Sequence, residues 1–174
     1  NDAIGVRTLL KKLDNLIICS SYSKNFGLYS ERVGCLIYHS KNMNNYSSVQ
    51  SNFKKVARTI YSNPPSHGSD IVKTILSDEN LKSLWKKNLN EAKNRIINMR
   101  KSLVENLIKE NCSRNFEFII NQKGMFSFTG LTQDEVDQLK EKFSIYIVNS
   151  GRINVAGVTS KNVNYIAKAI SSVT

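Results

Sequence analysis

The sequence predicts an α/β protein in which a small α+β domain follows the first half of the chain. Three observations predict this fold class. Two apolar runs of strand length, separated by a polar loop, follow a segment whose apolar residues recur at helical spacing. A helical pattern at 80–108 is longer than most globular helices, so we expect it to bridge two domains. Beyond it, short extended runs alternate with helices, and we place the domains at 1–90 and 91–174.

The first domain alternates helical and strand patterns. Asp2 stands where an N-cap would begin the first helix. Pro64 and Pro65 cannot continue the helix that precedes them, and the polar segment around Gly27 must be a loop. In chain order the segments are helix 2–13, strand 16–20, loop 21–27, strand 32–39, helix 44–57, loop 61–68 and helix 71–76.

The second domain begins inside the long helix. Thr132 and Glu135 have the spacing of a capping box, which predicts a helix start at this point. The other segments follow from their apolar spacing. In chain order they are helix 80–108, strands 116–120 and 124–129, helix 132–142, extended segments 145–148 and 151–156, and helix 160–171.

Composition excludes several classes of protein. The 174 residues include 25 Lys+Arg and 14 Asp+Glu, a net charge of +11, and the 40% hydrophobic content argues against disorder. No apolar run is long enough to span a bilayer, so we expect no membrane partner. The spacing of three cysteines and two histidines favours neither a metal site nor a disulfide framework, and we predict a cytoplasmic location. Because the chain starts at Asn1 without methionine, we expect it to be part of a longer protein.

Lys24 is the first residue whose position indicates chemistry. It lies in a polar loop directly after a predicted buried strand. A lysine held there can be desolvated, which favours attack on a carbonyl and formation of a Schiff base. Loop position alone is more typical of an ordinary surface lysine, so the surrounding residues decide between the two interpretations.

Four segments of the chain resemble the aspartate aminotransferases, which are pyridoxal-phosphate enzymes of fold type I. The segments occur in the family's order and at compatible spacing, and together they cover essentially the whole chain. They are SYSKNFGLYSERVG at 21–34, RTIYSNPPSHG at 58–68, GMFSFTG at 124–130 and SGRINVAG at 150–157. The resemblance implies that 1–90 is the remainder of the large cofactor-binding domain and that 91–174 is the small C-terminal domain.

The first segment matches the family's cofactor site. The resemblance implies that Lys24 forms the Schiff base with pyridoxal 5′-phosphate and then moves the proton of the substrate, acting as nucleophile and base in turn. Ser21 and Ser23 match hydroxyls near the cofactor phosphate. Arg32 matches the arginine that pairs with that phosphate, where a planar guanidinium suits a fixed dianion.

The other segments match substrate residues. The resemblance implies that Arg152, at the start of a strand, holds the substrate α-carboxylate, while Phe126 is either an apolar wall of the site or part of the core. Arg58 matches the arginine for the distal carboxylate, which reaches the neighbouring active site of a homodimer. The expected function is therefore transfer of the amino group between L-aspartate and 2-oxoglutarate. Relatives that prefer aromatic amino acids also keep this arginine, so a broad-specificity aminotransferase remains an alternative.

Two other interpretations belong to different classes. The charge of +11 is also typical of a basic module that binds polyanions, but the sequence contains no nucleic-acid-binding motif, and we expect no nucleic-acid partner. A degenerate relative that kept the fold and lost activity is the third. The family's pyridinium partner, its ring-stacking aromatic and its glycine-rich phosphate loop have no match here, so we expect the 174-residue segment alone to be inactive.

Overall fold

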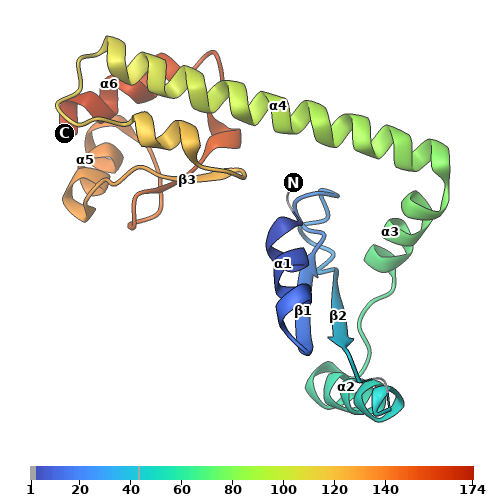
Figure 1. Cartoon of the computed structure of the whole chain (residues 1–174). Helices are drawn as coiled ribbons and strands as arrows, with labels where there is room; N and C mark the ends of the chain where they lie inside the picture. Colours follow the sequence, from blue (N-terminus) through green and yellow to red (C-terminus); the bar gives the residue numbers. More distant parts are fainter. Residues whose placement is uncertain (1–2, 43) are drawn as a thin grey trace. The chain divides into compact units, whose positions relative to one another are not determined.

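The computed structural model describes residues 3–42 and 44–174. The proposed N-cap at Asp2 lies outside the described residues. The chain forms two compact units, Asn1–Lys86 and Lys87–Thr174, and the break between them falls within the long helix α4, Glu79–Lys109. Figure 1 shows α4 as one continuous helix. Each unit is described in turn.

The first unit is built around a two-stranded antiparallel sheet. Strand β1 pairs with β2 from Asn15 opposite Ser40 to Ser21 opposite Gly34. Gly34 is required at the end of this ladder, because a Cβ there would lie 2.7 Å from the carbonyl oxygen of Ser20. The elements before α4 are α1 (Ile4–Lys12), β1 (Asn15–Ser21), β2 (Gly34–Ser40), α2 (Tyr46–Tyr61) and α3 (His67–Ser77), labelled in Figure 1.

The helices α2 and α3 are longer than their apolar spacing predicts. Helix α2 continues to Tyr61 and α3 already begins at His67, two residues after Pro65. The start of α4 has a clear local cause: Asp78 Oδ1 accepts hydrogen bonds from the backbone amides of Asn80 (2.8 Å) and Leu81 (2.9 Å). This side chain satisfies amides that a helix N-terminus leaves without partners.

The second unit contains most of the hydrophobic core. Its elements after α4 are η1 (Glu117–Asn121), β3 (Phe126–Phe128), α5 (Gln133–Phe143), β4 (Arg152–Asn154), η2 (Val155–Gly157) and α6 (Val163–Val173). Strands β3 and β4 pair antiparallel, with Phe126 opposite Asn154 and Phe128 opposite Arg152. Buried side chains of α4, α5 and α6, helices that Figure 1 labels, belong to one hydrophobic cluster. The side chains least accessible to solvent include Leu103, Val104 and Leu107 of α4, Leu139 of α5 and Ala167 of α6.

The predicted strand at 116–120 is wrong. These residues fall largely within the 3₁₀ helix η1, where Phe116 and Ile119 are buried while Phe118 and Ile120 are exposed. Burial therefore recurs every third residue, which fits a 3₁₀ turn and not a strand. Asn115 promotes the turn, because its side-chain oxygen accepts from the amide of Glu117 at 2.7 Å.

Residues 145–148 lie outside the described sheets. Burial alternates along the segment, with Ile145 and Ile147 half-buried against the core, but no strand of the described chain pairs with it. The segment starts directly after α5, where the amide of Ile145 bonds to the carbonyl of Leu139 and Ser144 adopts a left-handed conformation. Ile145 and Ile147 thus pack on the core although no described strand pairs with this segment.

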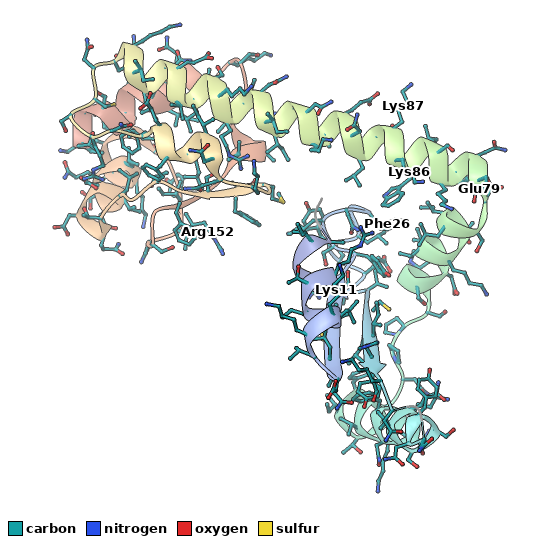
Figure 2. All side chains as sticks on the ribbon, in the orientation of Figure 1. Lys11, Phe26, Glu79, Lys86, Lys87 and Arg152 are labelled. Carbon is teal, nitrogen blue, oxygen red and sulfur yellow. The ribbon has the colours of Figure 1, made fainter. Side chains whose placement is uncertain are left out.

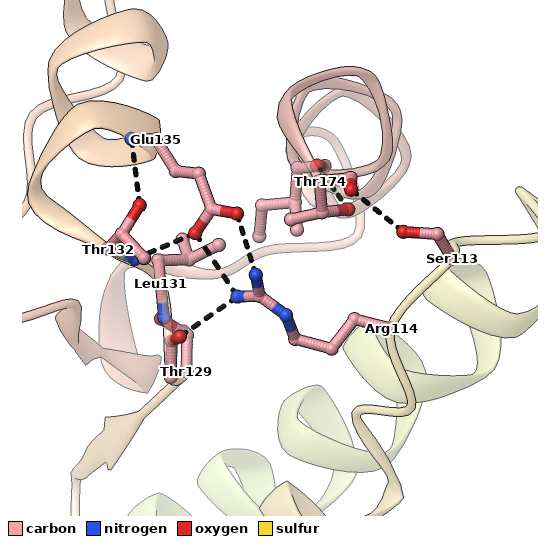
Figure 3. A network of polar contacts seen from close by, with 9 residues as sticks. Ser113, Arg114, Thr129, Leu131, Thr132, Glu135 and Thr174 are labelled. Carbon is pink, nitrogen blue, oxygen red and sulfur yellow. Dashed lines mark hydrogen bonds and ion pairs between the residues drawn. The ribbon is translucent and has the colours of Figure 1, made fainter.

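The capping box at the start of α5 is confirmed. Thr132 Oγ1 accepts from the amide of Glu135 at 3.3 Å, and the Glu135 carboxylate accepts from the amide of Thr132 at 2.7 Å. The guanidinium of Arg114 binds the same carboxylate at 2.6 and 3.1 Å and also donates to the carbonyl of Gly130 (Figure 3). Arg114 thereby joins the segment after α4 to the start of α5.

Glu135 is expected to stabilise the fold only above acidic pH. Burial raises the pKa of its carboxyl, but hydrogen bonds from Arg114 and Thr132 outweigh this and lower the pKa overall. A lowered native pKa adds stability that is fully present above the unfolded-state pKa, about 4.3, and is lost as the pH falls through the native pKa. We expect Glu135→Gln to cost ~1–2 kcal/mol near neutral pH.

Denaturant unfolding of the wild-type and Glu135→Gln proteins at steps between about pH 7 and pH 3 measures this. The difference in midpoint should be constant down to about pH 5 and should shrink at lower pH. A difference that stays constant into the acid range would contradict the role of the ionised carboxylate.

Candidate active site

The connection between β1 and β2 carries the predicted cofactor residues. Ser21 ends β1, and its hydroxyl donates to Ser23 Oγ at 3.1 Å and accepts from the amide of Ser23 at 3.2 Å. Ser23 is buried and Ser21 is exposed, and the hydrogen bond between them brings the two predicted hydroxyls together. Lys24 follows on an exposed turn closed by a hydrogen bond from the amide of Gly27 to the Lys24 carbonyl.

The Lys24 turn is anchored to α4 by the chain's single tryptophan. Trp85 Nε1 donates to the carbonyl of Asn25, the residue after Lys24, at 2.8 Å. Its indole stacks on Phe26, with ring centroids 4.6 Å apart and an interplanar angle of 14°, and Tyr22 meets Phe26 edge-on at 5.4 Å. Figure 2 labels Phe26 within this loop. Together these contacts fix the backbone on the C-terminal side of Lys24.

Tyr29 connects Lys24 with Arg32. The Lys24 Nζ lies 4.1 Å from the centroid of the Tyr29 ring, which is within cation–π distance. The Tyr29 carbonyl accepts from Arg32 Nη1 at 3.1 Å. Arg32 itself has a φ of 51°, in the left-handed region that non-glycine residues rarely occupy. Such backbone strain concentrates at functional sites.

The start of α3 packs against the residues on either side of Arg32. A Cβ on Gly68 would lie 2.8 Å from Glu31 Cβ and 3.0 Å from Val33 Cβ, so only glycine permits this approach. His67 Nδ1 lies 2.8 Å from Glu31 Oε2. The two residues that flank Arg32 are therefore packed against α3.

Arg58 lies on α2, outside the loop that carries Lys24 and Arg32. It is exposed in the last turn of α2, where its carbonyl accepts from the amide of Ser62 at 3.0 Å. Its guanidinium forms no hydrogen bond or ion pair within residues 3–42 and 44–174. Ser62 has a φ of 65°, so a strained residue marks the end of the helix.

In the second unit, the antiparallel pairing of β3 and β4 brings Arg152 and Phe126 together. Arg152 Cζ lies 5.0 Å from the centroid of the Phe126 ring. The Arg152 side chain, labelled in Figure 2, is exposed, and no carboxylate in the described chain pairs with it. Phe126 is 38% exposed, so its ring is a surface beside the guanidinium more than a member of the core.

Gly151 fixes the direction in which the chain enters β4. Its φ is 73°, and a Cβ there would lie 2.9 Å from the carbonyl oxygen of Leu131 and 3.1 Å from Thr129 Oγ1. The buried hydroxyl of Thr129 donates to the Gly151 carbonyl at 2.8 Å. The residue directly before Arg152 is thus held by backbone conformation and by a buried hydrogen bond.

Tyr29 and Trp85 belong to the surroundings of the site, although the sequence alone does not assign them a role there. Tyr29 lies inside the lysine segment, and its position five residues after Lys24 is the only signal that the sequence offers. Trp85 fits an apolar helix position, and its contact with Asn25 spans 60 residues of sequence. His67, which carries no motif role, contacts Glu31 beside Arg32.

The described residues hold neither a metal-binding cluster nor a membrane-spanning helix. Within that part of the chain, no group of three or more His, Cys, Asp or Glu side chains is arranged to hold a metal ion. No described helix is both long and apolar enough to cross a membrane. The predicted site residues Lys24, Arg32, Arg58 and Arg152 are exposed cations, and their charge suits anionic ligands.

Comparisons with known proteins agree with the resemblance. The family model "Aminotransferase class I and II" matches residues 1–170. The aspartate aminotransferase of Haemophilus influenzae is 45% identical over 172 residues, 99% of this chain and 43% of that protein. The mitochondrial aspartate aminotransferase of Dictyostelium discoideum is 42% identical over 173 residues, 99% of this chain and 41% of that protein. The chain thus spans about two fifths of the length of these curated relatives.

Solved structures give the same result. The cytoplasmic aspartate aminotransferase of Saccharomyces cerevisiae superposes with a TM-score of 0.94 at 40% identity, covering 99% of this chain and 43% of that one. An aromatic-amino-acid aminotransferase from Burkholderia pseudomallei, covalently bound to pyridoxal phosphate, gives 0.93 at 44% identity and covers the same shares. The α/β fold class expected from the sequence is confirmed. On the strength of these matches and of the lysine loop, the chain belongs to the class I and II aminotransferase family.

Proposed function

We propose that the protein containing this chain transfers the amino group between L-aspartate and 2-oxoglutarate, giving oxaloacetate and L-glutamate. The observation that carries the proposal is the lysine loop. One short connection presents an amine at Lys24, hydroxyls at Ser21 and Ser23 and a guanidinium at Arg32, and its backbone is held by α3 and α4. The names of the relatives support aspartate as substrate.

The residues of this loop suit pyridoxal 5′-phosphate. Lys24 Nζ would hold the cofactor covalently, and the phosphate would lie against Arg32 and the two serine hydroxyls. Arg32 uses Nη1 for the Tyr29 carbonyl, so other N–H donors of its guanidinium remain for a phosphate. When bound, the cofactor supplies an electron sink for the substrate Cα. The substrate amino group would displace Lys24, and the freed amine would then accept and return the proton at that carbon.

Arg152 would bind the α-carboxylate of the substrate. The fixed backbone at Gly151 and the contact with Phe126 orient the guanidinium, and a bidentate pair with a carboxylate orients the substrate in turn. The Phe126 ring would then form an apolar wall beside the bound amino acid. In this arrangement, Arg152 would raise the rate by orienting the Cα–H bond of the substrate.

Arg58 would bind the distal carboxylate from the partner subunit of a homodimer. Its guanidinium is exposed and unpaired within the described chain, as a residue that completes a neighbouring site would be. The second candidate function is a broad-specificity or aromatic aminotransferase, which the 44% identity to the Burkholderia pseudomallei enzyme favours. A cytoplasmic location, as in the yeast relative, remains our prediction, although the Dictyostelium discoideum relative is mitochondrial.

The test of the proposed function uses the full-length protein loaded with pyridoxal 5′-phosphate. Oxaloacetate formation from L-aspartate and 2-oxoglutarate is compared with 2-oxo acid formation from L-phenylalanine and L-alanine. We expect the highest kcat/KM for L-aspartate. Equal or higher values for L-phenylalanine would favour the second candidate, and no turnover of any amino acid would overturn the enzyme interpretation.

Replacing Arg58 by leucine is expected to change specificity more than chemistry. Loss of one charge-assisted carboxylate contact should lower kcat/KM for aspartate by on the order of 10²–10³-fold. Turnover of L-alanine, which has no distal carboxylate, should change by less than about threefold. Arg7→Leu, another exposed arginine of the first unit, is the matched control. Equal losses for aspartate and alanine would refute the assigned role.

A further inference from the structure

Arg100 of α4 is a charged side chain inside the second unit. It is 3% exposed, and within the described residues no carboxylate pairs with it. Burial lowers the pKa of its guanidinium. An unpaired buried charge is costly to a fold unless its donors are satisfied, so the groups that Arg100 does contact indicate why it is there.

Those groups all belong to one short segment that leads into and forms β3. Arg100 Nε donates to Ser127 Oγ at 3.2 Å, and Nη2 donates to the carbonyl of Gly124. Ser127 is 1% exposed and lies opposite Ile153 in the β3–β4 ladder. A single rigid guanidinium therefore bridges two points of the chain on either side of Phe126.

A second arginine of the same helix secures the chain after β4. Arg95 donates from Nη1 to the carbonyl of Ala156 at 3.2 Å and from Nη2 to the carbonyl of Val158 at 3.1 Å. The amide of Val155 meanwhile donates to the carbonyl of Met125 at 2.8 Å, at the end of the β3–β4 pairing. Helix α4 thus holds both strands of the small sheet that presents Phe126 and Arg152.

We propose that Arg100 is a positioning residue for substrate binding, which sets the orientation of Phe126 and Arg152 by fixing β3 to α4. The inference rests on the proposed function of Arg152. Ser127 points its side chain inward to Arg100, so its neighbour Phe126 must face the opposite side of the strand, where its ring meets Arg152. Release of Arg100 would let the strand shift, and a displacement of about 1 Å can cost 10²-fold in rate.

The experiment compares Arg100→Met and Arg100→Lys with Arg114→Met in the full-length holoenzyme. Arg114 is the control because it also bonds a backbone carbonyl of the second unit, that of Gly130, but its carboxylate partner Glu135 belongs to α5. Thermal unfolding midpoints, cofactor absorbance, and KM and kcat for L-aspartate and L-alanine are measured for each variant.

We expect Arg100→Met to lower kcat/KM on the order of 10²-fold for both amino acids, because the α-carboxylate is common to them, with cofactor absorbance retained. Arg100→Lys should lose about tenfold, since an ammonium keeps the charge but not the fork of donors. Arg114→Met should have a lower unfolding midpoint and an unchanged KM.

The proposal is overturned if either Arg100 variant loses stability as Arg114→Met does while its KM stays at the wild-type value. A wild-type enzyme that turns over neither amino acid would instead count against the proposed function.

Discussion

Replacing Lys24 by alanine is expected to lower aspartate transamination by the full-length holoenzyme on the order of 10⁴-fold. The variant loses the amine that would hold the cofactor and also the base that would move the substrate proton, and a positioned base alone is worth about 10²–10⁴-fold. The loop itself should keep its shape, because Trp85 bonds to the carbonyl of Asn25 and Phe26 stacks on its indole without any contribution from the lysine side chain.

Absorbance of the lysine-linked cofactor and the rate of oxaloacetate formation measure the effect. Lys87→Ala is the matched control, because Lys87 is an exposed lysine of α4 whose side chain points away from the helix in Figure 2. An added primary amine should restore part of the rate in Lys24→Ala, since it can accept the same proton. Retention of more than about a tenth of wild-type turnover would show that another group is the base.

Local sequence signals predict those parts of the fold whose cause is local. The capping box needs only Thr132 and Glu135, three residues apart, and it appears where the spacing indicates. The long helix agrees with its predicted bounds to within one residue at each end, because its apolar residues recur over many turns. The run at 116–120 is misleading because Phe116, Phe118 and Ile120 alternate as they would in a strand, whereas the Asn115 side chain promotes the 3₁₀ turn.

The residues of the candidate site also differ in whether a local sequence signal indicates them. Lys24, Arg32, Arg58 and Arg152 are exposed charges in distinctive short segments, so a family resemblance indicates them directly. Trp85 and Arg100 are different, because each acts through a contact that links α4 to a loop or strand distant in sequence. Their side chains are typical of an ordinary helix until the tertiary contacts are known. Residues that position a site are therefore harder to predict than residues that carry its chemistry.

Replacing Arg152 by leucine is expected to lower kcat/KM by on the order of 10³-fold for every amino acid substrate. Removing one partner of a hydrogen-bonded charge pair costs about 2–5 kcal/mol, and the loss falls on the α-carboxylate that all of them share. Stability should change little, because the side chain is exposed and the Phe126 ring that it contacts is 38% exposed. Steady-state kinetics with L-aspartate and L-alanine, together with a thermal unfolding midpoint, measure both expectations.

The comparison with Arg58→Leu makes the Arg152 prediction specific. Arg152→Leu should reduce the rates for L-aspartate and L-alanine by the same factor, whereas Arg58→Leu should reduce the rate for L-aspartate alone. Arg152→Lys should retain more activity than Arg152→Leu, because it keeps the charge while losing the bidentate geometry. If Arg152→Leu affected only the dicarboxylic substrate, the two arginines would have exchanged roles, and the α-carboxylate would have to be bound by a residue other than Arg152.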